Sequence, residues 1–214
     1  MTDKLSLFNG ALAALGESRL VSLAENVEPR YILSDIWDRD ALNTVLKSGQ
    51  WNFAGRTAEL DYSPSITPSF GYQYAFPKPD DFVRTMAVCH DEYLGTPLLQ
   101  YQDEANVWFC DEVKIYVQYV SNDPQWGGDF SLWPYDFTRW VELWLALQAA
   151  PVMTHSDGVI ENITMREKEA LSKAKNGDAM ESPTKQPPEG RWVGARRGPR
   201  GSRTDLGYRN RLIG

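Results

Sequence analysis

Apolar residues gather most densely between residues 133 and 153, in the segment WPYDFTRWVELWLALQAAPVM. From Phe137 onward, Arg139, Glu142 and Gln148 are the side chains that interrupt this run. A helix that is apolar on nearly all sides is buried from several directions. The pattern therefore predicts a central helix around which other helices pack, or which a second subunit covers.

The two sides of this central helix are expected to differ in what covers them. Trp140 and Trp144 should face the core of the subunit. Leu143 and Leu147 lie on the opposite side, where other helices or a neighbouring subunit should cover them. If one chain fills both sides, the helix carries no information about assembly.

Helical spacing also marks two segments near the N-terminus. Residues 3–15 carry an apolar stripe, with Asp3 placed to cap its start and Gly16 placed to end it in the left-handed conformation. A second helix is predicted from Pro29, which suits a first helical turn, as far as Ser48-Gly49.

After the central helix, the chain changes from helical to low-complexity character. A mostly solvated helix is predicted from a cap at Ser156-Asp157 to about Asn176-Gly177. From Ser182 the chain is rich in Pro, Gly and Arg and has too few apolar residues for a core. Residues 183–214, the C-terminal arm, are therefore expected to be extended and to become ordered on a partner.

Between about residues 50 and 122 the pattern changes to short aromatic and β-branched runs separated by Pro, Gly, Asn and Asp. The clearest pair of runs is Asn106 to Cys110 and Val113 to Ser121, separated by Asp111-Glu112. We expect these two runs to form a hairpin within a small antiparallel β region. The sequence thus predicts a mainly α fold: a bundle of about four helices in residues 1–182, with this β insertion, followed by the extended arm.

The charge of the chain is divided unevenly between the arm and the rest. The arm has eight basic and two acidic residues, a net charge of +6, while residues 1–182 have fourteen basic and twenty-seven acidic residues, a net charge of −13. An acidic surface disfavours nucleic-acid binding over most of the body. A basic arm can bind phosphate, an acidic protein surface, or the acidic body of a neighbouring copy.

Candidate chemistry is weak throughout the chain. Carboxylates gather at Asp35, Asp38 and Asp40 and at three adjacent acidic pairs, and solvated faces and turns account for them better than metal binding. His90 and His155 have no partner at metal-ligand spacing, and Gly127-Gly128 lacks the context of a phosphate loop. We therefore expect no enzyme activity, no cofactor and no metal. The three acidic pairs are Asp80-Asp81, Asp103-Glu104 and Asp111-Glu112.

Composition points to synthesis in the cytosol. No segment reaches the roughly 18 to 20 consecutive apolar residues of a membrane span, and the N-terminus is typical of a helix rather than a signal peptide. Cys89 and Cys110 have no disulfide or metal-binding spacing and are expected to be small buried residues, with pairing of the two as the alternative.

Three short motifs occur in an unusual order. They are LFNGALAALGESRLVSLAE at residues 7–25, KSGQWNFA at 47–54, and YQYAFPKPDDFVR at 72–84. This order resembles the head-to-tail adaptor family of tailed phages, similar to tail tubular protein A. In that family an Ala-Leu-rich helix ending in Gly-Glu leads to a helix closed by Trp-x-Phe, and then to a strand of the pattern Tyr-Ala-x-Pro-x-Asp. One extra residue leaves open whether Asp80 or Asp81 is the matching carboxylate.

The resemblance implies a structural virion protein that is made in the host cytoplasm. It would form a homo-oligomeric ring of twelve subunits beneath the portal vertex. The ring would join the portal protein to the next tail or nozzle protein, and duplex DNA would pass through its lumen without sequence-specific binding. No membrane is involved. The motifs cover the first 85 residues, and the arm matches none of them.

Two sets of contact residues follow from these expectations. The arm should dock on the portal or on an adjacent subunit through charge-assisted contacts. The loops Asp61 to Phe70 and Asn122 to Phe130 should project and contact neighbouring subunits or the next tail protein, through Phe70, Trp126 and Phe130. The docking residues of the arm are Arg191, Trp192, Arg196, Arg197, Arg200, Arg203, Tyr208, Arg209 and Arg211.

Two other classes of function stay open on the sequence alone. A DNA-binding accessory protein would use the basic arm together with exposed aromatic residues. An enzyme acting on nucleic acid or cell wall would need a metal-dependent activity that is lost on changing Asp35 or Asp38, and no spacing predicts one.

Overall fold

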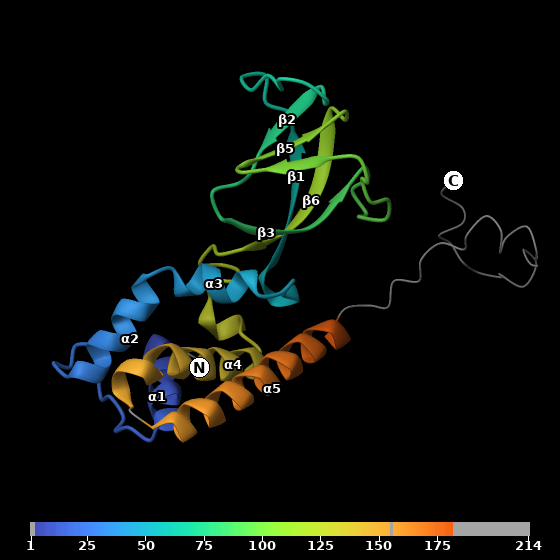
Figure 1. Ribbon diagram of the computed structural model, residues 1–214. Coiled ribbons are helices and arrows are strands. Elements are labelled where there is room, and N and C mark those ends of the chain that lie inside the picture. The colour runs from blue at the N-terminus through green and yellow to red at the C-terminus, as the bar shows by residue number, and fades with distance from the viewer. Residues whose placement is uncertain (1–2, 155, 182–214) are drawn as a thin grey trace, which may run out of the picture. The chain divides into compact units, whose positions relative to one another are not determined.

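The structure of the protein is a computed structural model, which describes residues 3–154 and 156–181. Figure 1 shows a group of helices and, between α3 and α4 along the chain, a group of strands. The helices are α1 (Lys4–Leu15), α2 (Glu28–Asp38), α3 (Ala41–Lys47), α4 (Tyr135–Met153) and α5 (Asp157–Glu181), with the short 3-10 helices η1 (Asn52–Ala54) and η2 (Phe130–Leu132). The strands are β1 (Gly55–Asp61), β2 (Tyr74–Pro77), β3 (Phe82–Cys89), β4 (Gln102–Glu104), β5 (Val107–Cys110) and β6 (Lys114–Ser121).

The expectation of a mainly α bundle is wrong, because the described chain combines five α-helices with two three-stranded antiparallel sheets and is mixed α/β. The sheets have the strand orders β1-β6-β3 and β2-β5-β4. Both sheets contribute to a second buried cluster, while Val83 of β3 and Val120 of β6 belong to the cluster that the helices form. The buried members of this second cluster are Phe76, Val88, Leu98, Trp108, Cys110, Ile115, Val117 and Tyr119.

The predicted hairpin is also wrong. β5 pairs with β2 and β4, whereas β6 pairs with β1 and β3, so the two strands belong to different sheets. Alternating apolar and polar residues show which face of a strand is buried, but they do not identify its partner. Only two acidic residues and Val113 separate the strands, and the chain uses this short link to pass from one sheet to the other.

The first helix is confirmed with both of its ends. The Asp3 Oδ1 atom accepts a hydrogen bond from the Ser6 backbone N–H at 2.7 Å and caps the start of α1. Gly16 ends the helix with φ +82°, a conformation that glycine adopts without steric cost.

The second predicted helix is divided into α2 and α3. The break falls at Asp40, which has φ +71°, and its carboxylate accepts a hydrogen bond from the Asn43 side chain at 2.6 Å. Asp tolerates the left-handed conformation better than most residues because its short side chain can bond locally. The apolar periodicity continues across the break, and this is why spacing alone predicts one helix.

The central helix is confirmed as α4, and α1, α2 and α5 pack against it. Trp140 and Leu143 are buried, while Trp144 and Leu147 pack against the same core with partial exposure. One chain therefore fills both sides of the helix. The apolar character of α4 carries no information about assembly, so this part of the expectation of oligomerisation is withdrawn.

Candidate interaction surfaces

The Trp-x-Phe element lies just after α3, where the chain leaves the helices for β1. The buried Trp51 donates a hydrogen bond from Nε1 to the Val45 carbonyl oxygen at 3.3 Å. The ring centroids of Trp51 and Phe53 lie 4.7 Å and 4.8 Å from that of Phe137 on α4. The element therefore fastens the end of α3 to the central helix.

The C-terminal end of α5 binds Asn52, which lies between Trp51 and Phe53 in the sequence. The Asn52 backbone N–H donates to the Asp178 Oδ1 atom at 2.7 Å, and the Asn52 side-chain Nδ2 donates to the Asp178 backbone oxygen at 2.7 Å. Burial raises the pKa of the Asp178 carboxyl. α5 extends past the predicted end at Asn176-Gly177 to Glu181, and this paired contact holds its last turns.

The Tyr-Ala-x-Pro-x-Asp element provides two buried apolar residues and a half-buried carboxylate. Ala75 and Phe76 on β2 are fully buried in the β region, residues 55–121. Asp81 precedes β3 and is hydrogen-bonded from three sides, whereas Asp80 is exposed. Asp81 is therefore the carboxylate on which the local structure depends.

Three side chains donate to Asp81. Arg56 on β1 forms an ion pair with it at 2.9 Å, and the hydroxyls of Tyr119 and Ser121 on β6 donate at 3.1 Å and 2.5 Å. Burial alone would raise the pKa of the Asp81 carboxyl, but the hydrogen bonds from Ser121, Arg56 and Tyr119 together lower it below its usual value. Burial and the neighbouring Asp81 charge raise the pKa of Tyr119 to about 12, so its hydroxyl remains a donor at neutral pH.

A second ion pair lies inside the β region. The Lys78 side chain is 6% exposed; its Nζ atom lies 2.5 Å from Asp103 Oδ1 and 4.6 Å from the centre of the Phe82 ring. Burial would raise the pKa of Asp103, but bonds from Lys78, Thr85 and Trp108 lower it. Because Lys78 is enclosed and already paired, it belongs to the structure rather than to a surface site.

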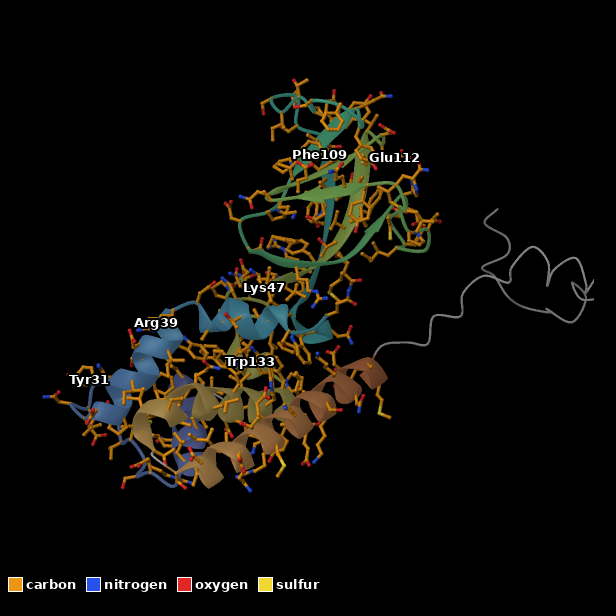
Figure 2. All side chains as sticks on the ribbon, viewed as in Figure 1. Tyr31, Arg39, Lys47, Phe109, Glu112 and Trp133 are labelled. Carbon is orange, nitrogen blue, oxygen red and sulfur yellow. The ribbon has the colours of Figure 1, made fainter. Side chains whose placement is uncertain are left out.

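The loop Asp61 to Phe70 contains the most exposed aromatic side chain of the described residues, Phe70, at 90%. The loop is tied to β2 by a hydrogen bond from the Ser63 N–H to the Ala75 carbonyl oxygen at 2.8 Å. Phe70 borders a hollow whose other lining residues include Tyr72 and Phe109. Figure 2 shows Phe109 among the side chains of the β region. This geometry suits contact with another protein.

The loop Asn122 to Phe130 is exposed at residues 124–126, whereas its second half packs against the subunit. Gly127 is buried, and a Cβ atom there would lie 2.3 Å from the Ser121 carbonyl oxygen. Its own carbonyl oxygen accepts a hydrogen bond from Trp133 Nε1 at 2.9 Å. Phe130 packs between the rings of Trp37 and Trp133, which gives it a packing role within the subunit. Trp126, at 36% exposed, is the aromatic residue of this loop that a partner could reach, next to the exposed Pro124 and Gln125.

A further surface of the β region was missed by reasoning from sequence. We call it the acidic patch, and it consists of Asp91, Glu92, Asp111 and Glu112 with the apolar residues Tyr93 and Leu99. Leu99 and Tyr93 are 87% and 77% exposed, and Glu112 lies in the β region in Figure 2. The signal in the sequence is that residues 85–113 contain six acidic residues and no Lys or Arg.

The carboxylates considered for chemistry are engaged locally. Asp35 pairs with Arg39, Asp38 pairs with Lys4, and Asp40 accepts a hydrogen bond from Asn43. Within residues 3–154 and 156–181, no three His, Cys, Asp or Glu side chains form a group that could hold a metal ion. Both Cys89 and Cys110 are buried, as expected, and burial raises the pKa of the Cys110 thiol.

The C-terminal arm with its predicted docking residues lies outside the described residues. Among the helices that the structure does describe, none is both long and apolar enough to cross a membrane. Comparison of the sequence with protein-family models and with curated proteins found no match. The assignment of a function therefore depends on the residues of the chain itself.

Proposed function

We propose that this protein is a structural protein of a tailed-phage virion, an adaptor whose ring joins the portal to the tail and surrounds part of the DNA channel. The proposal rests on the resemblance of its three motifs to the adaptor family. One structural observation supports it most: the motif residues Trp51, Phe53 and Asp81 all lie where the helices pass into the β region. Residues at the place where the helices meet the β region are constrained by packing on both sides. Their order along the chain therefore supports the resemblance to the adaptor family.

The division of charge supports the same role. An acidic body with a net charge of −13 would not adhere to DNA moving past it, because like charges repel. The arm, with a net charge of +6, supplies the opposite charge for attachment to a protein partner. Cyclic assembly would use the same contacts in every subunit.

Removal of residues 183–214 tests the attachment. The shortened protein should no longer bind the portal ring in co-sedimentation, because the basic docking residues are gone. Its helices should melt cooperatively as in the full chain, since every buried residue of both cores lies between residues 7 and 174. Undiminished portal binding by the shortened protein would contradict the proposed docking.

A matched pair of charge variants tests whether portal binding depends on the arginines of the arm or on positive charge anywhere in the protein. Replacing four arm arginines by Gln should weaken portal binding at least about tenfold, because charge-assisted contacts are lost. The control removes the same number of positive charges from exposed positions of α5 and should bind as the wild type does. The arm variant changes Arg196, Arg197, Arg200 and Arg203, and the control changes Arg166, Lys168, Lys173 and Lys175.

The basic arm also makes a DNA-binding accessory protein the second candidate. Of the aromatic residues between 126 and 137 that could stack on bases, Trp133 and Phe137 are buried and Phe130 packs between two tryptophans, so Trp126 and Tyr135 remain for this candidate. Salt-sensitive binding of duplex or single-stranded DNA by the purified subunit, with no binding to the portal, would favour this candidate.

A further inference from the structure

The acidic residues of the described body differ in whether a cation neutralises them. Asp81 is paired with Arg56 and Asp103 with Lys78, and the pairs on α2 and α4 also include a Lys or Arg. Asp91, Glu92, Asp111 and Glu112 have no ion pair with a Lys or Arg in the described chain. Glu112 pairs with His90, and Asp91 and Asp111 accept hydrogen bonds from backbone N–H groups, so the patch keeps a negative charge that no Lys or Arg of the described chain neutralises.

The patch is also shaped to receive a chain with apolar side chains. His90, Leu98, Leu99, Gln100, Asp111 and Glu112 line a hollow, and the Glu112 carboxylate lies 3.1 Å from His90 Nδ1. The exposed Leu99 side chain lines the same hollow as these carboxylates, and the exposed Tyr93 is hydrogen-bonded to Glu92 on the loop that follows His90. Exposed apolar side chains next to unpaired charge are typical of a protein-binding surface.

The C-terminal arm has the complementary composition. It carries eight basic residues and, between them, the apolar residues Trp192, Val193, Leu206, Tyr208 and Leu212. Its 32 residues, from 183 to 214, span up to about 105 Å when extended, at roughly 3.3 Å per residue. That length is enough to cross from one subunit to the next, since a body of this size is only a few tens of ångströms across.

We propose that the last part of the arm of one subunit binds the acidic patch of a second copy, with Arg209 and Arg211 against Glu92, Asp111 and Glu112 and with Leu206 and Tyr208 against Leu99 and Tyr93. Arg196, Arg197, Arg200 and Arg203 then remain for the portal. This inference rests on the proposed ring, and it names the surface that holds neighbouring subunits together. A contact of this kind uses the same two surfaces in every subunit, so it can repeat around a closed ring.

A charge exchange between the two surfaces tests the proposal in the full chain. Glu92→Lys with Glu112→Lys reverses the patch, and Arg209→Glu with Arg211→Glu reverses the part of the arm proposed to bind it. Sedimentation velocity at low salt should show that each double variant self-associates at least about tenfold more weakly than the wild type, because like charges then meet. The protein carrying all four changes should recover association to within about threefold.

Matched variants show whether the position of the charge matters. Glu17→Lys with Glu161→Lys makes the same charge change at two exposed positions away from the patch, and it should associate as the wild type does. Leu99→Ser keeps the charge and should weaken association about threefold, since it removes apolar contact area. Wild-type association of the patch variant, or no recovery when the exchange is complete, would overturn the proposal.

Portal binding separates this inference from the proposed function. If the wild type binds the portal ring and reversal of the patch leaves self-association unchanged, the adaptor role stands and the patch contact is overturned. If the charge exchange restores association but the wild type does not bind the portal ring, the patch contact is supported and the adaptor role is contradicted. A protein that sediments as a monomer at every concentration would also overturn the proposed contact between copies.

Discussion

Asp81 is the single residue on which the join between β1, β3 and β6 depends most. Its carboxylate accepts hydrogen bonds from Arg56, Tyr119 and Ser121, and Ser121 is completely buried. Asp81→Ala leaves two buried hydroxyls without their acceptor, which should lower the free energy of unfolding by about 1–3 kcal/mol at pH 7. Chemical denaturation followed by fluorescence measures this loss.

The neighbouring carboxylate provides the control. Asp80 is exposed and should tolerate replacement by Ala with little change in stability. Equal losses for the two variants would contradict the special role of Asp81. The short motif predicts that one of the two carboxylates matters, but it cannot select Asp81, because the selection depends on hydroxyls and a guanidinium that are distant in sequence.

The same residue predicts how stability depends on pH. The pKa values of Asp81 and Asp103 lie below their usual value in the folded protein, so the folded state holds fewer protons than the unfolded state near pH 4. Their contribution is present above about pH 4 and is lost as the pH falls through the folded pKa values. In Asp81→Ala this acid-dependent loss should be smaller, with the Asp103 part remaining.

At the scale of elements, the end of α5 is expected to depend on its contact with η1. Asp178→Ala removes the acceptor of the Asn52 backbone N–H, so the free energy of unfolding should fall by about 1–2 kcal/mol. Amide hydrogen exchange should accelerate in the last turns of α5. Asn176→Ala, an exposed neighbour on the same helix, should cause no such acceleration. Unchanged exchange in Asp178→Ala would show that the contact does not hold the helix.

Sequence patterns predict elements best where the information is local. The cap at Asp3, the glycine end at Gly16 and the apolar run of α4 are all properties of neighbouring residues, and these predictions are confirmed. The break at Asp40 is not visible because an apolar stripe continues through it. The pairing of β5 and β6 with strands of different sheets depends on contacts made far along the chain, so it could not be read from alternation.

The candidate surfaces show the same difference between local and distant information. Phe70 is predicted as exposed from its Pro-rich loop, and the structure places it so. Phe130 lies in a segment with similar composition but packs against Trp37, a residue on a helix far away in sequence. The hollow in the acidic patch is lined by His90, residues 97–100 and residues 111–112, and only the fold brings these stretches together.

At the scale of the whole molecule, the exposed aromatic of the β region should matter for assembly rather than for folding. Phe70→Asp removes a large apolar surface that the subunit itself does not cover, so its melting temperature should stay close to that of the wild type. Joining of tails to filled heads should fall, as counted by electron microscopy of particles. Ser65→Asp, an exposed change in the same loop that does not line the hollow beside Phe70, is the control, and normal particles from Phe70→Asp would contradict a contact role.

The adaptor role as a whole is tested most directly by mass. The purified full-length protein should be measured by native mass spectrometry, first alone and then mixed with the portal ring encoded by the same genome. We predict that the protein binds the portal ring and that the added mass corresponds to a closed ring of subunits. A protein that stays monomeric in both measurements would contradict the adaptor role.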